Sequence, residues 1–147
     1  MLKKETIYSG IIGAVVADAL GVPYEFHSRT DMQEKPATSM TGYGTYNQPP
    51  GTWSDDSSLT LATMDSLING LNYEDMMHKF GQWYQDAKYS PTDEVFDIGK
   101  TTQSALQNYL YYNKKALNCG LTGAYDNGNG SLMRILPATL YINAKQL

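Results

Sequence analysis

Apolar side chains recur at intervals of three or four residues along most of this 147-residue chain, a spacing that is typical of helices burying one face. Stretches in which apolar and polar residues alternate, the pattern of a half-buried strand, are absent. The sequence therefore predicts an all-α fold. No linker or internal repeat divides the chain, so we expect a single domain over residues 1–147. The expected helices cover residues 4–20, 54–69, 73–85, 101–115 and 131–144.

These helices are bounded by residues that commonly start or stop helices. The stretch Gly21 to Pro23 ends the first helix, and Gly70 ends the second. Pro137 falls inside the last helix, so we expect either a kink there or a place for this proline in the first turn. Residues 27–53 are polar, rich in glycine and proline, and without periodicity. Irregular segments of this length are uncommon unless they serve a function.

The acidic balance of the chain limits its partners. A formal net charge of -4 gives no general attraction to a phosphate backbone, so we expect no nucleic-acid partner. An acidic protein that binds a phosphate-bearing ligand needs a local positive feature, such as a metal ion, a helix N-terminus or an arginine. The single cysteine, Cys119, can form neither an internal disulfide nor a thiolate zinc site alone. This suits a reducing compartment, and we expect a cytoplasmic protein.

The N-terminal segment is apolar enough to be compared with a signal peptide or a membrane span. Asp18 interrupts the apolar stretch from Ile11 to Leu20, and the spacing predicts an amphipathic helix instead. No run reaches the roughly 18 consecutive apolar residues that a membrane span requires, so we expect no membrane partner. The apolar stripe of this helix consists of Ile7, Ile11, Ile12, Val15, Val16 and Ala19.

The segment from Ser54 to Asp56 carries the strongest chemical signal, at the expected start of the second helix. In a structural interpretation, Ser54 caps the helix and the carboxylates of Asp55 and Asp56 complement the positive end of its dipole. In the other interpretation the segment binds a hard cation, because a hydroxyl and two carboxylates on a fixed backbone offer the oxygen ligands that Mg²⁺ prefers. The spacing alone leaves both open and favours the first.

A cation site would need a further carboxylate, and Glu25 is the candidate. It follows the first expected helix and lies between two aromatic residues, Tyr24 and Phe26. A carboxylate among aromatic rings is not a packing residue, although an exposed loop residue is an equally good interpretation of its position.

Four segments of the chain match, in order, the motifs of one family. They are Gly13–Gly21 with Pro23–Phe26, Thr52–Asp56, Phe96–Thr102, and Gly128–Ile135 with Pro137. On these motifs the chain resembles the ADP-ribosylglycohydrolases, which include dinitrogenase-reductase-activating glycohydrolases and ADP-ribosyl-arginine hydrolases. Each motif is weak alone, but the four together extend over nearly the whole chain.

The resemblance implies a helical fold around a binuclear Mg²⁺ centre, with Mn²⁺ as an alternative ion. It implies hydrolysis of the N- or O-glycosidic bond at the ribose C1 of an ADP-ribosylated protein side chain or a related ADP-ribose derivative. By position, Ser54, Asp55 and Asp56 are the implied metal ligands. Glu25 is placed at the edge of the metal site, where it binds or activates water, and Glu25 and Asp55 are the implied catalytic residues.

Further residues are implied to bind the substrate. Asp97 matches an acidic position near the ribose, and a glycine-rich loop matches a segment that wraps ADP-ribose. Glycine in that loop allows close approach and unusual dihedral angles, and its amides can face a diphosphate. A simple turn with a helix cap is the alternative interpretation of the loop, and a solvated surface residue is the alternative for its arginine. The implied loop contacts are Gly128, Asn129, Gly130, Ser131, Met133 and Arg134.

The chain also departs from the family pattern. Family members are longer, and their later half supplies an Asp-x-Asp-Thr motif that completes the second metal site; this chain lacks that motif. Two Mg²⁺ ions carry a charge of +4, whereas Asp55, Asp56 and Glu25 supply -3, so we expect at most one well-held ion. We also expect that a C-terminal half is missing, that apolar helix faces are left uncovered, and that a separate second-half polypeptide is a partner.

Three functions remain open at this stage. The chain is a hydrolase that becomes active when completed, a non-catalytic ADP-ribose binder, or a structural relative of the crystallin kind. The retained carboxylates favour the first two, since a purely structural role needs no acidic cluster.

Overall fold

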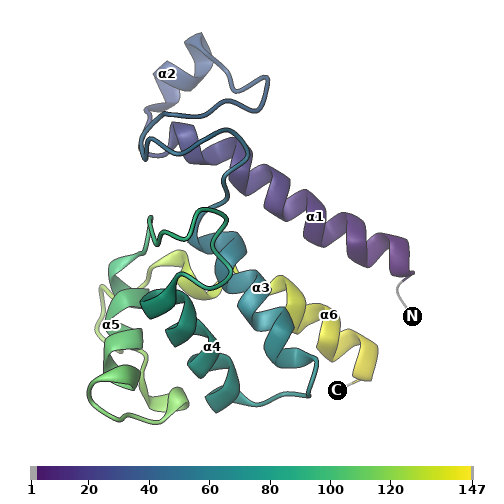
Figure 1. Ribbon diagram of the computed structural model, residues 1–147, viewed down its shortest axis with the longest axis vertical. Helices are drawn as coiled ribbons and strands as arrows, with labels where there is room; N and C mark the ends of the chain where they lie inside the picture. Colours follow the sequence, from purple (N-terminus) through teal and green to yellow (C-terminus); the bar gives the residue numbers. More distant parts are fainter. Residues whose placement is uncertain (1–2, 147) are drawn as a thin grey trace.

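The computed structural model describes residues 3–146, which form helices joined by loops, with no strand within that range. The prediction of an all-α fold is confirmed. The helices, labelled in Figure 1, are α1 Lys4–Gly21, α2 Arg29–Glu34, α3 Asp55–Leu67, α4 Tyr73–Asp86, α5 Lys100–Leu110 and α6 Leu136–Lys145. Short 3-10 turns cover Val22–Tyr24, Ala116–Asn118 and Asn129–Ser131.

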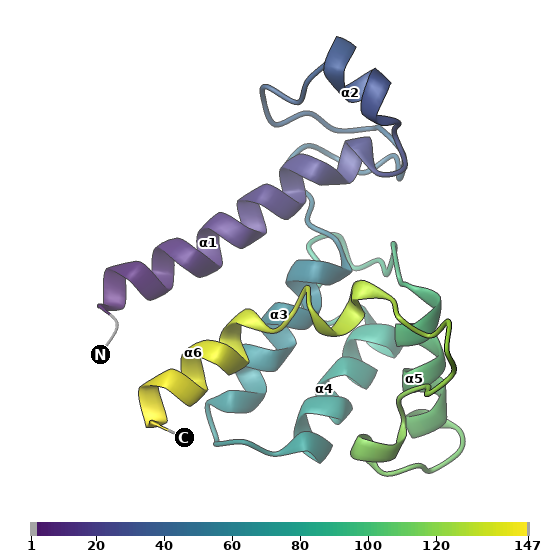
Figure 2. The ribbon, with the colours of Figure 1, turned by 180° about the vertical axis from the view of Figure 1, so that it is seen from behind.

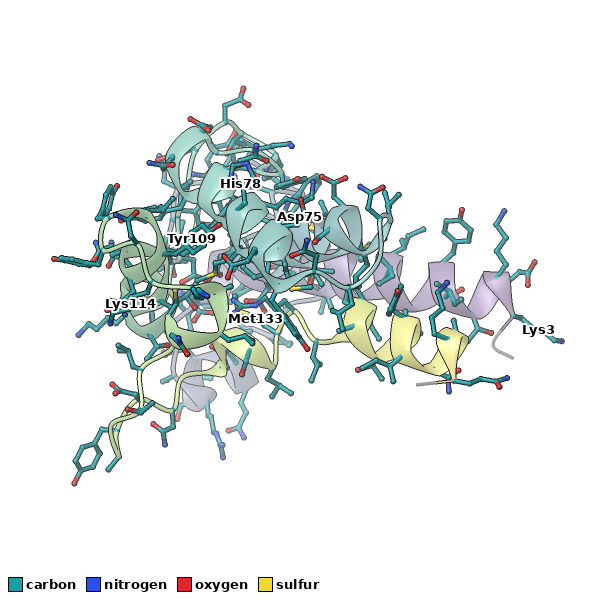
Figure 3. The ribbon with its side chains drawn as sticks, turned by 90° about the horizontal axis from the view of Figure 1, so that it is seen from below. Lys3, Asp75, His78, Tyr109, Lys114 and Met133 are labelled. Carbon is teal, nitrogen blue, oxygen red and sulfur yellow. The ribbon has the colours of Figure 1, made fainter. Side chains whose placement is uncertain are left out.

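Helix α3 lies at the centre of the arrangement and contacts α1, α4 and α6 (Figure 2). The hydrophobic core joins α3, α4 and α5, since it consists of Leu59, Ala62, Phe80, Trp83 and Leu106. Figure 3 shows α1 and α6 side by side, extending away from α4 and α5. The C-terminal end of α1, α2 and the long segment that follows them lie beyond the N-terminal end of α3 (Figure 1).

Helix α3 is buried although much of its sequence is polar. Its hydroxyls are hydrogen-bonded within the protein: Ser58 Oγ donates to the carbonyl of Ser54 at 2.8 Å, and Thr63 Oγ1 donates to that of Leu59 at 2.8 Å. Ser66 Oγ donates to a carboxylate oxygen of Asp75 on α4 at 2.6 Å. Because these donors are satisfied, small hydroxyl side chains let neighbouring helices approach α3 closely.

The predicted apolar stripe of α1 is divided in the structure. Ile11 and Ala19 are buried, whereas the side chains of Ile12 and Val16 are 58% and 50% exposed. Only one edge of the stripe therefore packs against α3 and α6.

By length and composition alone, Lys4–Tyr24 could cross a membrane, with a mean hydropathy of 1.5. This differs from the expectation for this segment, because the mean over the window tolerates a few polar residues that interrupt an apolar run. The core helix of a soluble protein and a signal sequence pass the same test, so the finding is a weak indication.

Two predicted helices have different bounds. The fourth ends at Leu110, and Asn113 beyond it adopts the left-handed conformation, with φ of 52°. The last begins at Leu136 rather than at residue 131 and holds Pro137 in its first turn, which was one of the two expected placements. A proline fits there because the first-turn amides have no partner within the helix.

Helix α2 was not predicted and lies within the segment expected to be irregular. Ser28 and Asp31 cap it reciprocally: Ser28 Oγ accepts from the amide of Asp31 at 3.1 Å, and Asp31 Oδ2 accepts from the amide of Ser28 at 3.0 Å. This capping box stabilises a short helix that has no buried residue.

Candidate active site

A cavity of about 620 Å³ opens where the C-terminal end of α1 meets the N-terminal ends of α3 and α5. This volume lies within the range of small-molecule sites. Lys100 is the only lysine or arginine among the described residues that line it. The lining includes the carboxylates of Asp18, Glu25, Asp55, Asp56 and Asp97.

The N-terminus of α3 presents two of these carboxylates. Ser54 is its N-cap, and Ser54 Oγ accepts a hydrogen bond from the amide of Asp56 at 3.3 Å. Asp55 is only 5% exposed, and Asp56 is half-buried. The capping interpretation of Ser54 is therefore confirmed, and the same cap holds Asp55 and Asp56 against the cavity.

The carboxylates raise one another's pKa values. Burial raises the pKa of Asp55 to about 8, and the charges of Asp97, Asp56 and Asp18 add to the shift. Burial also raises the pKa of Asp56 to about 6, with Asp18, Asp97 and Glu25 contributing. Partial desolvation at the cavity edge, followed by the charges of Asp97 and Asp18, raises the pKa of Glu25. Such mutual repulsion is relieved when a cation binds.

Asp97 is held by a tyrosine from the long segment between α2 and α3. The hydroxyl of Tyr46 donates to Asp97 Oδ1, and the Tyr46 ring packs on Phe96 with ring centroids 5.2 Å apart. Burial raises the pKa of Asp97, the hydrogen bond from Tyr46 opposes that rise, and Asp18 adds to it. Tyr46 was not a predicted site residue, although it lies in the irregular segment of residues 27–53, and segments of that length are uncommon unless they serve a function.

Asp18 was not among the predicted site residues either, although it interrupts the N-terminal apolar stretch and lies within the matched segment Gly13–Gly21. The Asp18 carboxylate accepts hydrogen bonds from the start of α3, 36 residues away for Ser54. A carboxylate on the apolar side of a helix was the available signal, because buried charges need partners.

The glycine-rich loop reaches the cavity with four of its six predicted contact residues, Gly128, Asn129, Gly130 and Met133. Ser131 is not part of the lining. The expected unusual dihedral angles are not found, since neither Gly128 nor Gly130 has a positive φ. The expected close approach of these glycines is found, but it is to other residues of the protein. A Cβ on Gly128 would lie 2.8 Å from Thr101 Oγ1, and one on Gly130 would lie 2.3 Å from Thr102 Oγ1. The loop therefore packs on the N-terminus of α5.

Arg134 is half-buried and is not part of the cavity lining. Its guanidinium lies over the Phe80 ring at 4.7 Å from the centroid, and its buried Nη1 atom has no hydrogen-bond partner within residues 3–146. Burial lowers the pKa of Arg134, while the charge of Asp55 opposes that change. The guanidinium is thus a cation with one buried nitrogen, close enough to Asp55 for that carboxylate to affect its pKa.

The donor types in the cavity fit Mg²⁺ or Mn²⁺, which prefer carboxylate and hydroxyl oxygens. Ser54, Asp55, Asp56 and Glu25 all line it. Within residues 3–146, however, no three His, Cys, Asp or Glu side chains gather closely enough around one point to form a ready metal cluster. The cavity thus fits a cation in chemistry, and its side chains would have to rotate to gather around one.

Comparisons with known proteins indicate the same family as the sequence motifs that contain the site residues. The sequence profile of the ADP-ribosylglycohydrolase family matches residues 2–147. The chain is 30% identical over 133 residues to ADP-ribosylarginine hydrolase Tri1 of Serratia proteamaculans (strain 568), a match that covers 89% of this chain and 35% of that protein. It is 31% identical over 133 residues to ADP-ribosyl-[dinitrogen reductase] glycohydrolase of Rhodospirillum rubrum, covering 88% of this chain and 42% of that protein.

A solved structure described as an ADP-ribosylglycohydrolase-related protein complex has the same fold, with a TM-score of 0.72 and 30% identity. The match covers 91% of this chain and 41% of that one. The chain thus spans well under half the length of these relatives. It belongs to the ADP-ribosylglycohydrolase family.

Proposed function

We propose that this chain contributes the acidic part of the active site of a Mg²⁺-dependent ADP-ribosyl glycohydrolase, which releases ADP-ribose from a modified protein side chain. The observation that carries the proposal is the presence of Glu25, Asp55, Asp56 and Asp97 on one cavity. Relatives named ADP-ribosylarginine hydrolase make ADP-ribosylarginine the first substrate to test.

The residues divide the chemistry among them. Ser54, Asp55, Asp56 and Glu25 would hold one Mg²⁺ ion, which supplies Lewis-acid stabilisation and lowers the pKa of bound water. The Glu25 carboxylate accepts the proton of the attacking water, since it lies exposed at the cavity edge and partial burial, with the charges of Asp97 and Asp18, raises its pKa. Asp97 accepts a hydrogen bond from a ribose hydroxyl while the glycosidic bond breaks through an oxocarbenium-like state.

The diphosphate of the substrate needs a positive environment, and α5 offers one within the cavity. Its N-cap is Gly99, which has no side-chain capping bond, so first-turn amides are available to an anion. Lys100, Thr101 and Thr102 line the same cavity. We therefore place the diphosphate at the start of α5 and the ribose at the start of α3, with the loop around Gly130 between them and solvent.

An apolar groove between α1, α6 and the C-terminal end of α3 supports a further polypeptide partner. The groove has a volume of about 260 Å³. Ile68, one of its lining residues, is 78% exposed. We propose that helices of the remaining part of the family fold cover this groove, whether they belong to the same polypeptide or to a separate one. Its lining consists of Ile7, Ile11, Met64, Leu67, Ile68, Pro137, Leu140 and Tyr141.

A non-catalytic ADP-ribose binder is the second candidate. It is favoured by the finding that no three potential ligand side chains gather around one point within residues 3–146. In this case the cavity and the α5 N-terminus would bind ADP-ribose without Mg²⁺ and without cleavage.

Two measurements test these proposals. Calorimetry of this chain with ADP-ribose, with and without MgCl₂, should show binding that Mg²⁺ strengthens. Release of ADP-ribose from an arginine-modified protein should then appear when the chain is mixed with a polypeptide supplying the remainder of a relative. Binding without any release would favour the non-catalytic binder, and absence of both would exclude both functions.

A further inference from the structure

We propose that Asp18 is a positioning residue that acts through Ser54: its carboxylate accepts the hydrogen bond from the Ser54 hydroxyl and thereby turns an oxygen lone pair of Ser54 toward the cation site. This inference rests on the proposed function, because it assigns a role in cation binding. It adds a residue from α1 to a site whose proposed ligands at the start of α3 lie 36 or more positions later.

The contacts of Asp18 are unusually complete for a carboxylate at a cavity. Its Oδ1 accepts from Ser54 Oγ at 2.7 Å and from the Ser54 amide at 3.2 Å. Its Oδ2 accepts from Ser57 Oγ at 2.5 Å, from the Ser57 amide at 3.1 Å and from the Ser54 amide at 3.1 Å. Because both oxygens are already engaged with several donors, Asp18 is a poor candidate for a direct ligand, although it lines the cavity.

The hydrogen bonds of Ser54 determine which way its hydroxyl faces. A serine hydroxyl has one proton and two lone pairs. The Ser54 hydroxyl donates its hydrogen bond to Asp18, and one of its lone pairs accepts a hydrogen bond from the amide of Asp56 at 3.3 Å. One lone pair is left, and Ser54 lines the cavity. The hydroxyl therefore offers oxygen rather than hydrogen to the cavity, which is the orientation that a cation requires.

An arrangement in which a carboxylate orients a ligand from behind is common at metal sites, and changing the supporting residue typically weakens metal binding about tenfold to a hundredfold. Ser57 provides the comparison within the same structure, because its hydroxyl also donates to Asp18 but Ser57 does not line the cavity.

The test is a double-mutant cycle read out by titration of the whole chain with MgCl₂ and MnCl₂ in a calorimeter. In Asp18→Asn an amide NH₂ group would face the hydroxyl and amide donors of Ser54 and Ser57, so Ser54 would lose its fixed orientation. Cation binding should therefore weaken about tenfold or more. Ser54→Ala should weaken it similarly. Adding Asp18→Asn to Ser54→Ala should cause less than about a threefold further loss, because the two residues act as one unit.

Matched controls separate this role from a general effect on folding or charge. Asp31→Asn removes the same charge from another helix-capping carboxylate, on α2, and Ser57→Ala removes the other hydroxyl that Asp18 holds. Both should bind the cation within about threefold of the unmodified chain, and circular dichroism should show the same helix content for all variants. If Asp18→Asn does not fold, Asp18→Glu replaces it, since it keeps the charge but moves the carboxylate.

The outcomes distinguish the inference from the proposed function. If the unmodified chain and its completed form bind neither cation, the proposed metal site fails. If the unmodified chain binds and a folded Asp18 variant binds equally well, the inference is wrong. It is also wrong if the losses from Asp18→Asn and Ser54→Ala simply add.

Discussion

The Tyr46 hydroxyl donates a hydrogen bond to the Asp97 carboxylate, and this contact joins the segment between α2 and α3 to the segment that leads into α5. The two residues are 51 positions apart. The contact explains why a long segment with little secondary structure keeps one defined position beside the cavity, because hydrogen bonds to charged groups are stronger than those between neutral groups.

Replacing Tyr46 with phenylalanine should therefore impair the site without unfolding the protein. The hydrogen bond from Tyr46 lowers the pKa of Asp97, so Tyr46→Phe should raise that pKa further and weaken ADP-ribose binding about tenfold, the effect of losing roughly 1.5 kcal/mol. Calorimetry measures the affinity, and carbon-detected NMR titration measures the pKa. The control is Tyr43→Phe, which removes the hydroxyl of a 66% exposed ring; equal effects of both variants would contradict the prediction.

The acidic cluster predicts an unusual dependence of stability on pH. The folded-state pKa of Asp55, about 8, lies above its ordinary value of 3.8, so the stability that Asp55 contributes is present at low pH and is lost as the pH rises through 8. Asp56, with a pKa of about 6, contributes a similar loss of stability as the pH rises through 6. The melting temperature in EDTA should fall between pH 5 and pH 8.5.

Two comparisons make that measurement specific to the cluster. Asp55→Asn carries no titrating group at this position and should show a smaller fall, and MgCl₂ should reduce the fall for the unmodified chain. A melting temperature that stays constant or increases over this pH range would refute the assignment of a raised pKa to Asp55.

The contact between the glycine-rich loop and α5 can be tested with one methyl group. In Gly130→Ala the new Cβ would lie 2.3 Å from Thr102 Oγ1, so the loop or the threonine must move. We expect a loss of about 1–3 kcal/mol in the free energy of unfolding, as for overpacked sites, and weaker ADP-ribose binding. Chemical denaturation and calorimetry measure the two effects. Gly120→Ala, whose Cβ would have no neighbour within 4 Å, should change neither.

The apolar groove between α1, α3 and α6 predicts a change in association rather than in folding. Ile68→Asp places a charge on a side chain that is 78% exposed, so the chain alone should keep its melting temperature. Its affinity for a polypeptide supplying the remainder of a relative should fall about tenfold or more, because a buried unpaired charge is costly. Leu117→Asp, at a residue that is 75% exposed and lies outside the groove, is the control. Analytical ultracentrifugation of the mixtures measures the association. Equal association of both variants would contradict the prediction.

Local features of the molecule were accessible from the sequence. The apolar spacing located α1 and α4 almost to the residue, and the serine before two aspartates marked the start of α3. These predictions succeed because helix periodicity and capping depend on residues within one or two turns of each other. Two features were not predicted in this way. Helix α2 has a capping box but no apolar stripe, and the apolar spacing did not indicate where α5 ends.

Contacts between distant segments were decided only by the tertiary structure. The sequence showed Asp18 as a polar residue in an apolar helix, but its partners at Ser54 and Ser57 depend on how α1 crosses α3. For Arg134 the sequence suggested a phosphate contact or a surface position, and the contact of its guanidinium with the Phe80 ring became visible only in the structure. The sequence by itself thus determined most of the helices, but not α2 or the bounds of α5 and α6, and it indicated the type of chemistry that they carry. Which charges share one cavity was decided by helix packing, because the partner of a buried polar group is chosen by the geometry of the whole fold and not by its neighbours in the chain.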